Sequence, residues 1–192
     1  MKSLDLYLED AAKAHGHLCA GQVLGVRLAV YGLNLLGIQD PHGADRKRIV
    51  TFVEIDRCAT DAVALVTGCR LGKRALKFRD WGKMAATFVD VQSGRAVRVA
   101  ARESSKALAR EMHPEMSKNE QQMLAYREMP DEQLFTHEWV RVDLPEQEFP
   151  GYKGERIVCA ECGEGVAFRR EVVRDGRTLC RGCAGERYYT QI

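Results

Sequence analysis

The chain has 192 residues, of which 45% are hydrophobic and 29% charged, which suits one sizeable folded domain with a small second one. A formal net charge of +2 excludes the large basic excess by which many proteins hold nucleic acid or anionic membranes. The first ten residues alternate charged with apolar side chains, and the most apolar later stretch, 28–38, is about half a membrane span. We therefore expect a cytoplasmic protein with no membrane segment.

Apolar spacing in the first third of the chain predicts helices followed by a strand. Apolar residues recur at helical intervals over 3–14 and again over 20–36, where Gly37 is a natural C-terminal cap. The β-branched run 49–55 predicts a buried strand, and 61–67 predicts a short helix.

The middle of the chain predicts a hairpin and then further helices. The runs 83–91 and 95–100 flank Ser93-Gly94, which is typical of a β-hairpin turn. Three elements follow: a helix over 101–112, a helix opened by the capping box Ser117-x-x-Glu120, and a strand over 137–143. Because strands and helices mix without a regular βαβ alternation, we predict an α+β fold with a mixed or antiparallel sheet and packed helices.

Two prolines and two glycines mark the interdomain linker. They are Pro145, Pro150, Gly151 and Gly154. We predict an α+β domain over residues 1–150 and a small four-cysteine domain, a zinc ribbon or finger, over 151–192.

Two Cys-x-x-Cys pairs dominate the small domain. Cys159 and Cys162 are separated by seventeen residues from Cys180 and Cys183, and each pair can place two thiolates on one Zn²⁺ ion. Strand-like runs at 166–168 and 171–174 and a turn at Asp175-Gly176 fill the interval. Two disulfides or unrelated thiols are the alternative, but the odd count of seven cysteines favours metal. Four thiolates leave no open position, so we predict a structural zinc.

The same segment resembles a known zinc finger. Cys159-Ala-Glu-Cys-Gly-Glu164 and Leu179-Cys-Arg-Gly-Cys-Ala-Gly185 are similar to the short finger of the DksA/TraR family. Some members of that family bind RNA polymerase through a coiled-coil tip. That tip has no counterpart here, so the resemblance implies the finger and not the role.

The first chemically rich segment of the body is His15-Gly-His-Leu-Cys19. Two imidazoles and a thiol within five residues, with Gly16 at a helix end, form a compact set of metal ligands or acid–base groups. The alternative is that the histidines are solvated and that Cys19 is a small buried apolar residue.

A second segment follows the predicted strand 49–55. Its carboxylates, thiols and lysines are Glu54, Asp56, Cys58, Asp61, Cys69, Lys73, Asp80 and Lys83. Loops at strand ends often present reactive groups, although each of these residues taken singly is also an ordinary surface or core residue. Gly68 and Gly72-Lys73 do not make a phosphate-binding P-loop, because the glycine spacing is one short and Arg74 replaces the Ser or Thr.

Several motifs together resemble the FmdE family, which is named after formylmethanofuran dehydrogenase. They are His15-Gly-His-Leu-Cys19, Asp61-Ala-Val-Ala-Leu-Val-Thr-Gly-Cys69, Gly72-Lys73 and Phe78-Arg-Asp-Trp-Gly-Lys83, and the resemblance covers roughly residues 10–150. It implies an α+β core, dimerisation and a Cys/His pocket able to hold a metal. The family name comes from association with a molybdenum or tungsten enzyme, so the resemblance also suggests an enzyme or an accessory subunit in one-carbon metabolism.

The leading hypothesis is a metal-binding protein. His17, Cys19 and Cys58, with His15 as an alternative ligand, would hold a second divalent metal, zinc or iron. Asp61 or Glu54 would orient a ligand or act as an acid–base group, and Lys73 and Lys83 would neutralise an anionic substrate or lower a thiol pKa. The candidate catalytic residues are thus Cys58, Asp61, Lys73 and Lys83.

Two other functions remain open from the sequence. One is metal-free thiol redox chemistry by Cys19, Cys58 and Cys69. The other is a regulatory or interaction protein whose finger docks on protein or nucleic acid through its arginines at 169, 170, 174, 177 and 181. Partner enzyme subunits are a further expectation. The apolar helix 20–36 also suggests a homodimer, because it offers more hydrophobic surface than one small sheet readily covers.

Overall fold

The computed structural model describes residues 1–190 and 192, and the chain forms two compact units, Met1–Asp143 and Leu144–Ile192. The boundary predicted near residue 150 falls inside the second unit. Among the described residues, no helix is long and apolar enough to cross a membrane.

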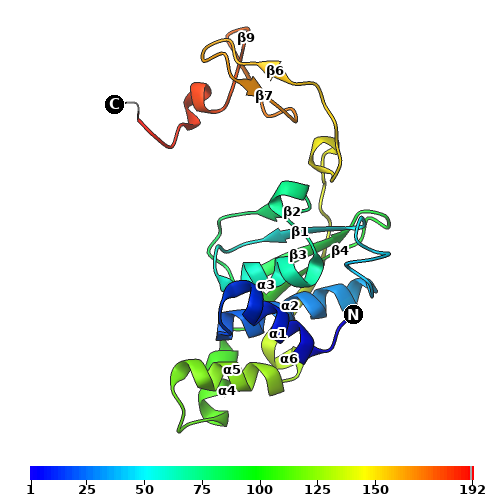
Figure 1. Ribbon diagram of the computed structural model, residues 1–192, viewed down its shortest axis with the longest axis vertical. Coiled ribbons are helices and arrows are strands. Elements are labelled where there is room, and N and C mark those ends of the chain that lie inside the picture. The colour runs from blue at the N-terminus through cyan, green and yellow to red at the C-terminus, as the bar shows by residue number, and fades with distance from the viewer. Residues whose placement is uncertain (191) are drawn as a thin grey trace. The chain divides into compact units, whose positions relative to one another are not determined.

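The first unit is built on a five-stranded mixed sheet (Figure 1). In spatial order the strands are β2 (Leu76–Phe78), β1 (Ile49–Val53), β3 (Ala85–Asp90), β4 (Ala96–Ala101) and β5 (Phe135–Val140). Only β1 and β2 pair in parallel, and the other neighbours are antiparallel. The predicted α+β class, mixed sheet and hairpin are therefore confirmed. Strand β2 was not predicted, because its three residues are too few to show a periodic pattern.

Helices pack mainly on one face of this sheet (Figure 1). They are α1 (Leu4–His15), α2 (Ala20–Leu36), α3 (Cys58–Thr67), α4 (Ser104–Met112), α5 (Lys118–Glu128) and α6 (Asp131–Leu134), and a 3₁₀ turn, η1, spans Leu71–Lys73. The predicted capping box of Ser117 and Glu120 opens α5. Helix α3 begins three residues earlier than predicted, so Cys58 lies at its first position rather than in the loop before it.

Helix α2 is the centre of the core. It packs on α1, α3, α5 and the strands β3 and β4, and eleven of its residues are buried within the chain. The apolar surface on which the homodimer prediction rested is therefore covered by the chain itself.

Glycines let α2 and α3 touch along their first turns. A Cβ atom on Gly25 would lie 2.6 Å from the carbonyl oxygen of Ala59, and one on Gly21 would lie 3.2 Å from the Cβ atom of Cys58. Real Cβ atoms do not tolerate the first distance. The close contact brings the start of α3, with Cys58, against the start of α2, where Cys19 is the N-cap residue.

The second unit consists of two short hairpins and two single helical turns. Strands β6 (Ile157–Val158) and β7 (Gly165–Val166) pair with each other, as do β8 (Val172–Arg174) and β9 (Arg177–Leu179), and the turns η2 and η3 span Glu146–Glu148 and Gly182–Glu186. Asp175 and Gly176 both have positive φ, at 51° and 70°, which fits the predicted tight turn. The strand predicted over 166–168 is wrong at its end, because Phe168 has a φ of 64° and leaves the extended conformation.

Candidate metal centres and an adjoining pocket

The junction between α1 and α2 gathers three potential metal ligands. One ligand atom from each of His15, His17 and Cys19 lies within 4.8 Å of the other two, and the two imidazole centroids are 5.0 Å apart. Gly16 permits this gathering, because its φ of 91° ends α1 in a left-handed turn. Imidazole nitrogen with thiolate sulfur is a donor set that suits zinc or ferrous iron better than magnesium or calcium.

Asp61 holds one of these imidazoles. Its Oδ2 atom accepts a hydrogen bond from Nδ1 of His15 at 3.0 Å when that nitrogen carries the proton. This carboxylate–histidine arrangement leaves Nε2 of His15 as the free lone pair and raises its strength as a ligand. The geometry therefore fits the orienting role predicted for Asp61.

Cys58 stands beside Cys19 rather than within the three-ligand group. Burial raises the pKa of the Cys58 thiol, and its hydrogen bond with the Cys19 thiol raises that pKa further. Gln22 fixes the backbone at this point by donating from Nε2 to the carbonyl oxygen of Cys58 at 2.5 Å. The structure thus brings Cys58 to the edge of the cluster, with Cys19 as its nearest partner in it.

Other candidates from the sequence lie apart from the cluster. Glu54 is buried and receives two hydrogen bonds of 2.7 Å from the guanidinium of Arg98, so its carboxylate is already neutralised. The ammonium group of Lys83 lies 5.6 Å from the centroid of the Trp81 ring. Cys69 is buried against Thr51 and the carbonyl oxygen of Ile49, and burial raises the pKa of its thiol. These contacts describe structural residues.

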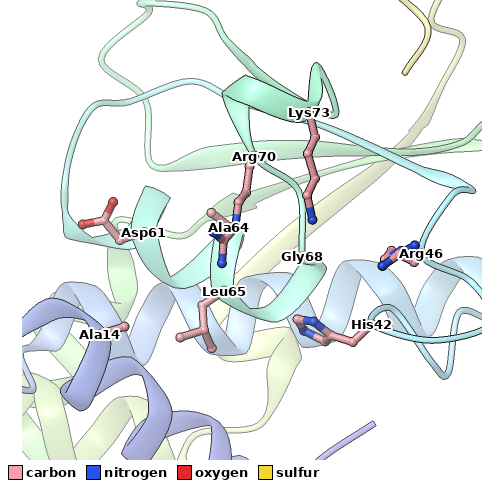
Figure 2. Close-up of a pocket in the computed structure, with 9 residues that line it drawn as sticks. All are labelled: Ala14, His42, Arg46, Asp61, Ala64, Leu65, Gly68, Arg70 and Lys73. Atoms are coloured by element: carbon pink, nitrogen blue, oxygen red, sulfur yellow. The ribbon is translucent and has the colours of Figure 1, made fainter. Parts of the chain in front are cut away.

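An open pocket of about 560 Å³ lies over the outer side of α3 (Figure 2). Nine residues line it: Ala14, His42, Arg46, Asp61, Ala64, Leu65, Gly68, Arg70 and Lys73. Lys73 and Asp61, both predicted as functional, therefore share one pocket. Asp61 also joins that pocket to the His/Cys cluster through its hydrogen bond with His15.

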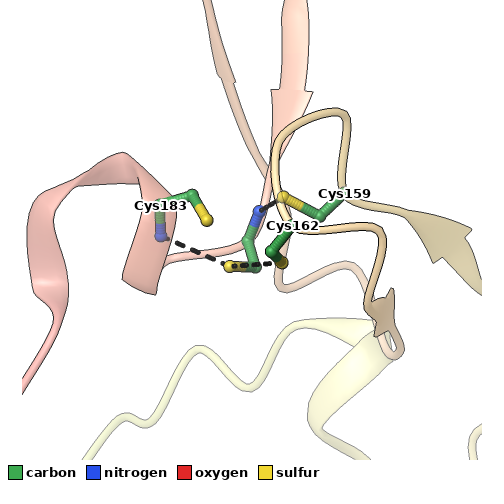
Figure 3. A group of neighbouring side chains, drawn as sticks. Cys159, Cys162 and Cys183 are labelled. Carbon is green, nitrogen blue, oxygen red and sulfur yellow. Dashed lines mark hydrogen bonds between the residues drawn. The ribbon is translucent and has the colours of Figure 1, made fainter. Parts of the chain in front are cut away.

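The second metal centre is the four-cysteine cluster of the C-terminal unit (Figure 3). The sulfur atoms of Cys159, Cys162, Cys180 and Cys183 lie within 4.8 Å of one another, and those of Cys162 and Cys180 are 4.0 Å apart. A tetrahedral site with Zn–S bonds of about 2.3 Å separates its sulfurs by about 3.8 Å, so the four thiols fit a structural zinc.

Backbone amides prepare this cluster for a cation. The N–H group of Cys180 donates to the sulfur of Cys159 at 3.2 Å, and that of Cys183 donates to the sulfur of Cys180 at 3.3 Å. Amide donation from Cys162, followed by Cys180 and Glu161, lowers the pKa of Cys159 to about 6. Burial and the neighbouring thiols raise the pKa of Cys183 to about 12. Such a set loses all its protons only when a cation offsets the accumulated charge.

The arginines of the finger are mostly engaged within the same unit. Ion pairs of 3.4–3.9 Å join Arg169 to Glu146, Arg170 to Glu148, Arg177 to Glu161 and Arg181 to Glu186. Local carboxylates therefore offset most of the basic face on which the nucleic-acid hypothesis depends.

Sequence reasoning missed several residues around the first unit's site. Gln22, His42, Arg46 and Arg70 were not singled out, because polar residues in a helix or a loop are individually unremarkable. A signal existed only for Gln22, which is a polar residue one turn after Cys19 in an otherwise apolar helix.

Two family models match the chain. The FmdE family, described as the molybdenum formylmethanofuran dehydrogenase operon family, matches residues 14–136. The prokaryotic DksA/TraR C4-type zinc finger matches residues 152–189. The two matches fall in the two structural units.

Two known proteins are similar to the chain over most of its length. A probable S-adenosyl-L-methionine-binding protein from Archaeoglobus fulgidus is 31% identical over 199 residues, which cover 93% of this chain and 52% of the relative. The chain therefore spans about half the length of that curated relative. The crystal structure of an FmdE-like protein of tungsten formylmethanofuran dehydrogenase, from Syntrophus aciditrophicus, matches with a TM-score of 0.65 and 21% identity, covering 98% of this chain and 96% of that one. At that identity the match shows a shared fold.

Proposed function

The chain belongs to the FmdE family, and from that premise we propose that its first unit binds one divalent metal ion, zinc or ferrous iron, beside the structural zinc of the finger. The observation that carries the proposal is the convergence of His15, His17 and Cys19, whose ligand atoms lie within 4.8 Å of one another. Cys58, as the neighbour of Cys19, supplies a fourth ligand or a nearby thiol.

The protein's own groups divide the work around this metal. Asp61 holds His15 in the tautomer whose Nε2 is free, and Gln22 anchors the backbone of Cys58. Three protein ligands leave a position at which a bound metal acts as a Lewis acid or activates water. Lys73, which lines the pocket with Asp61, supplies positive charge for an anionic substrate. We propose on this basis a catalytic or accessory role in one-carbon or molybdenum-enzyme metabolism.

Metal stoichiometry tests the proposal directly. The intact chain, purified without oxygen, should hold about two metal ions, one in each unit. Cys19→Ser should reduce this to about one, and the matched control Cys69→Ser should keep both, because Cys69 has its own partners in the core. Equal metal content in Cys19→Ser and in the unaltered chain would contradict a site at His15, His17 and Cys19.

The same experiment separates metal binding from thiol redox chemistry. A redox protein would hold only the finger zinc and would form a reversible disulfide between the adjacent thiols of Cys19 and Cys58 on mild oxidation. Mass spectrometry of the alkylated chain detects that bond. A metal protein keeps both thiols reduced and protected from alkylation while the metal is bound.

The name of the Archaeoglobus relative gives a second candidate function, S-adenosylmethionine binding. Its support is the 31% identity, which extends over 93% of this chain. Calorimetric titration with S-adenosylmethionine tests it. Saturable binding that survives Cys19→Ser and metal removal would favour this candidate over the metal function.

We also propose that the chain forms a homodimer and works with partner subunits. The buried helix α2 no longer supports the dimer, but exposed apolar side chains lie around the edge strand β2, namely Leu71, Phe78 and Trp81. Sedimentation at micromolar concentration tests the dimer, and Leu71→Ser with Trp81→Ser should shift it toward the monomer. A monomer in the unaltered chain would remove the claim.

A further inference from the structure

Three cations from separate segments converge on the pocket over α3. Arg46 comes from the loop before β1, Arg70 from the loop after α3, and Lys73 from η1. Figure 2 shows these side chains and the ring of His42 around the hollow, with Asp61 at the end far from Arg46. The pocket is therefore positively charged over most of its length and is acidic only where it meets the His/Cys cluster.

These cations lack the partners that arginines have elsewhere in the unit. Arg27 pairs with Asp131, Arg48 with Asp45 and Asp90, and Arg98 with Glu54. The side chains of Arg46, Arg70 and Lys73 form no ion pair or hydrogen bond with the residues that the structure describes. Their charge is available to a ligand.

The C-terminal end of α3 accounts for only part of this charge. Helix carbonyls at a C-terminus attract cations, and α3 ends at Thr67 beside the pocket. That end carries about half a negative charge, and the carboxylate of Asp61 adds one. Set against three cations, they leave a surplus of roughly 1.5 positive charges, even with His42 neutral. A solvated surface has no reason to concentrate such a surplus in a hollow.

We propose that this pocket binds the phosphate group of a small-molecule ligand, with the rest of the ligand directed toward His15. A phosphate monoester carries a charge of about −1.5 to −2 at pH 7, which matches the surplus, whereas a single carboxylate leaves part of it unbalanced. Arginine forks suit phosphate oxygens, and a volume of about 560 Å³ falls in the range of small-molecule sites. The inference rests on the proposed function for one point only, that the other end of the ligand meets the metal.

Calorimetric titration of the full chain with inorganic phosphate and with pyrophosphate tests the site. Arg70→Gln combined with Lys73→Gln should weaken binding at least tenfold, and Arg46→Gln alone should weaken it several-fold. Lys47→Gln is the matched control, because Lys47 is exposed next to Arg46 but does not line the pocket. Thermal unfolding checks that the variants fold, and Arg46→Gln from its separate loop gives an independent reading if the double variant does not.

Three results would overturn the inference. They are no saturable phosphate binding at millimolar concentration, an equal loss in Lys47→Gln, and tighter binding of acetate than of phosphate. Repeating the titration in Cys19→Ser separates the two proposals. Phosphate binding that persists there, together with the loss of one metal, supports both proposals. Phosphate binding that disappears there is binding to the metal and contradicts the pocket.

Discussion

The Nδ1 atom of His15 lies 3.0 Å from Oδ2 of Asp61, although the two residues are 46 positions apart in the chain. The contact joins the end of α1 to the first turns of α3. It also connects the potential metal ligands to the cationic pocket, because Asp61 takes part in both.

Asp61→Asn should lower the metal affinity of the first unit about 10- to 100-fold, because the imidazole loses the carboxylate that fixes its tautomer. Competition with a chromophoric chelator measures the affinity in the full chain, and the finger zinc provides an internal reference. Asp56→Asn is the control, since Asp56 is exposed nearby and lies outside the ligand group and the pocket. Equal affinities of the two variants would refute the orienting role.

Cys180→Ser should release about one zinc per chain and unfold residues 155–192 while the first unit stays folded. The buried apolar core of the finger is only Cys159, Leu179 and Ala184, so the metal supplies much of its folding free energy. Elemental analysis and limited proteolysis check the two effects. An unaltered zinc content would show that the four-cysteine assignment is wrong.

Arg98→Met should lower the free energy of unfolding by about 3–5 kcal/mol, because it leaves the carboxylate of Glu54 buried without a partner. The double variant Glu54→Gln with Arg98→Met should lose less than the single one. Urea unfolding gives both values, and Arg141→Met, at an exposed ion pair, should change stability by less than about 1 kcal/mol. A double variant less stable than Arg98→Met would contradict the stranded-charge explanation.

Asp90 should make the first unit sensitive to acid. Hydrogen bonding from Arg48, with help from Ser93 and Gln92, lowers the pKa of Asp90 from 3.8 to about 2. Because the folded-state pKa is the lower one, the ionised group stabilises the fold above pH 4, and this contribution is lost as the pH falls from about 4 to 2. Asp90→Asn should therefore cost about 2 kcal/mol at pH 7 and almost nothing at pH 2.

Paired unfolding curves at several pH values check this expectation for Asp90. Asp143→Asn is the control, because Asp143 lies in an exposed pair with Arg141. A difference between Asp90→Asn and the unaltered chain that stays constant with pH would show that the carboxylate charge is not the cause.

The sequence predicted local structure best where the pattern is long or chemically specific. Helix α2, the capping box of Ser117 and Glu120, and the hairpin around Gly94 all follow from spacing or turn chemistry within a few residues. Strand β2 did not follow, because its three residues pair with β1 only after α3 and η1 have brought them there. That placement is tertiary and leaves no local pattern.

The candidate site divides in the same way. The ligands at positions 15, 17 and 19 are adjacent in sequence, so their convergence was predictable from one turn. The bidentate partner of Glu54 and the cations at positions 46 and 70 come from distant segments. Only the folded chain shows that the first carboxylate is neutralised and that the cations share a pocket with Lys73.

Gly25 gives this site a vulnerability far from any ligand. A single methyl group there would meet the backbone of Ala59 at 2.6 Å, so α3 would have to move away from α2. The same displacement would separate the thiol of Cys58 from that of Cys19 and stretch the contact between Asp61 and His15. In a saturation mutagenesis screen for metal occupancy, Gly25→Ala would then score like the loss of a ligand, although position 25 coordinates nothing.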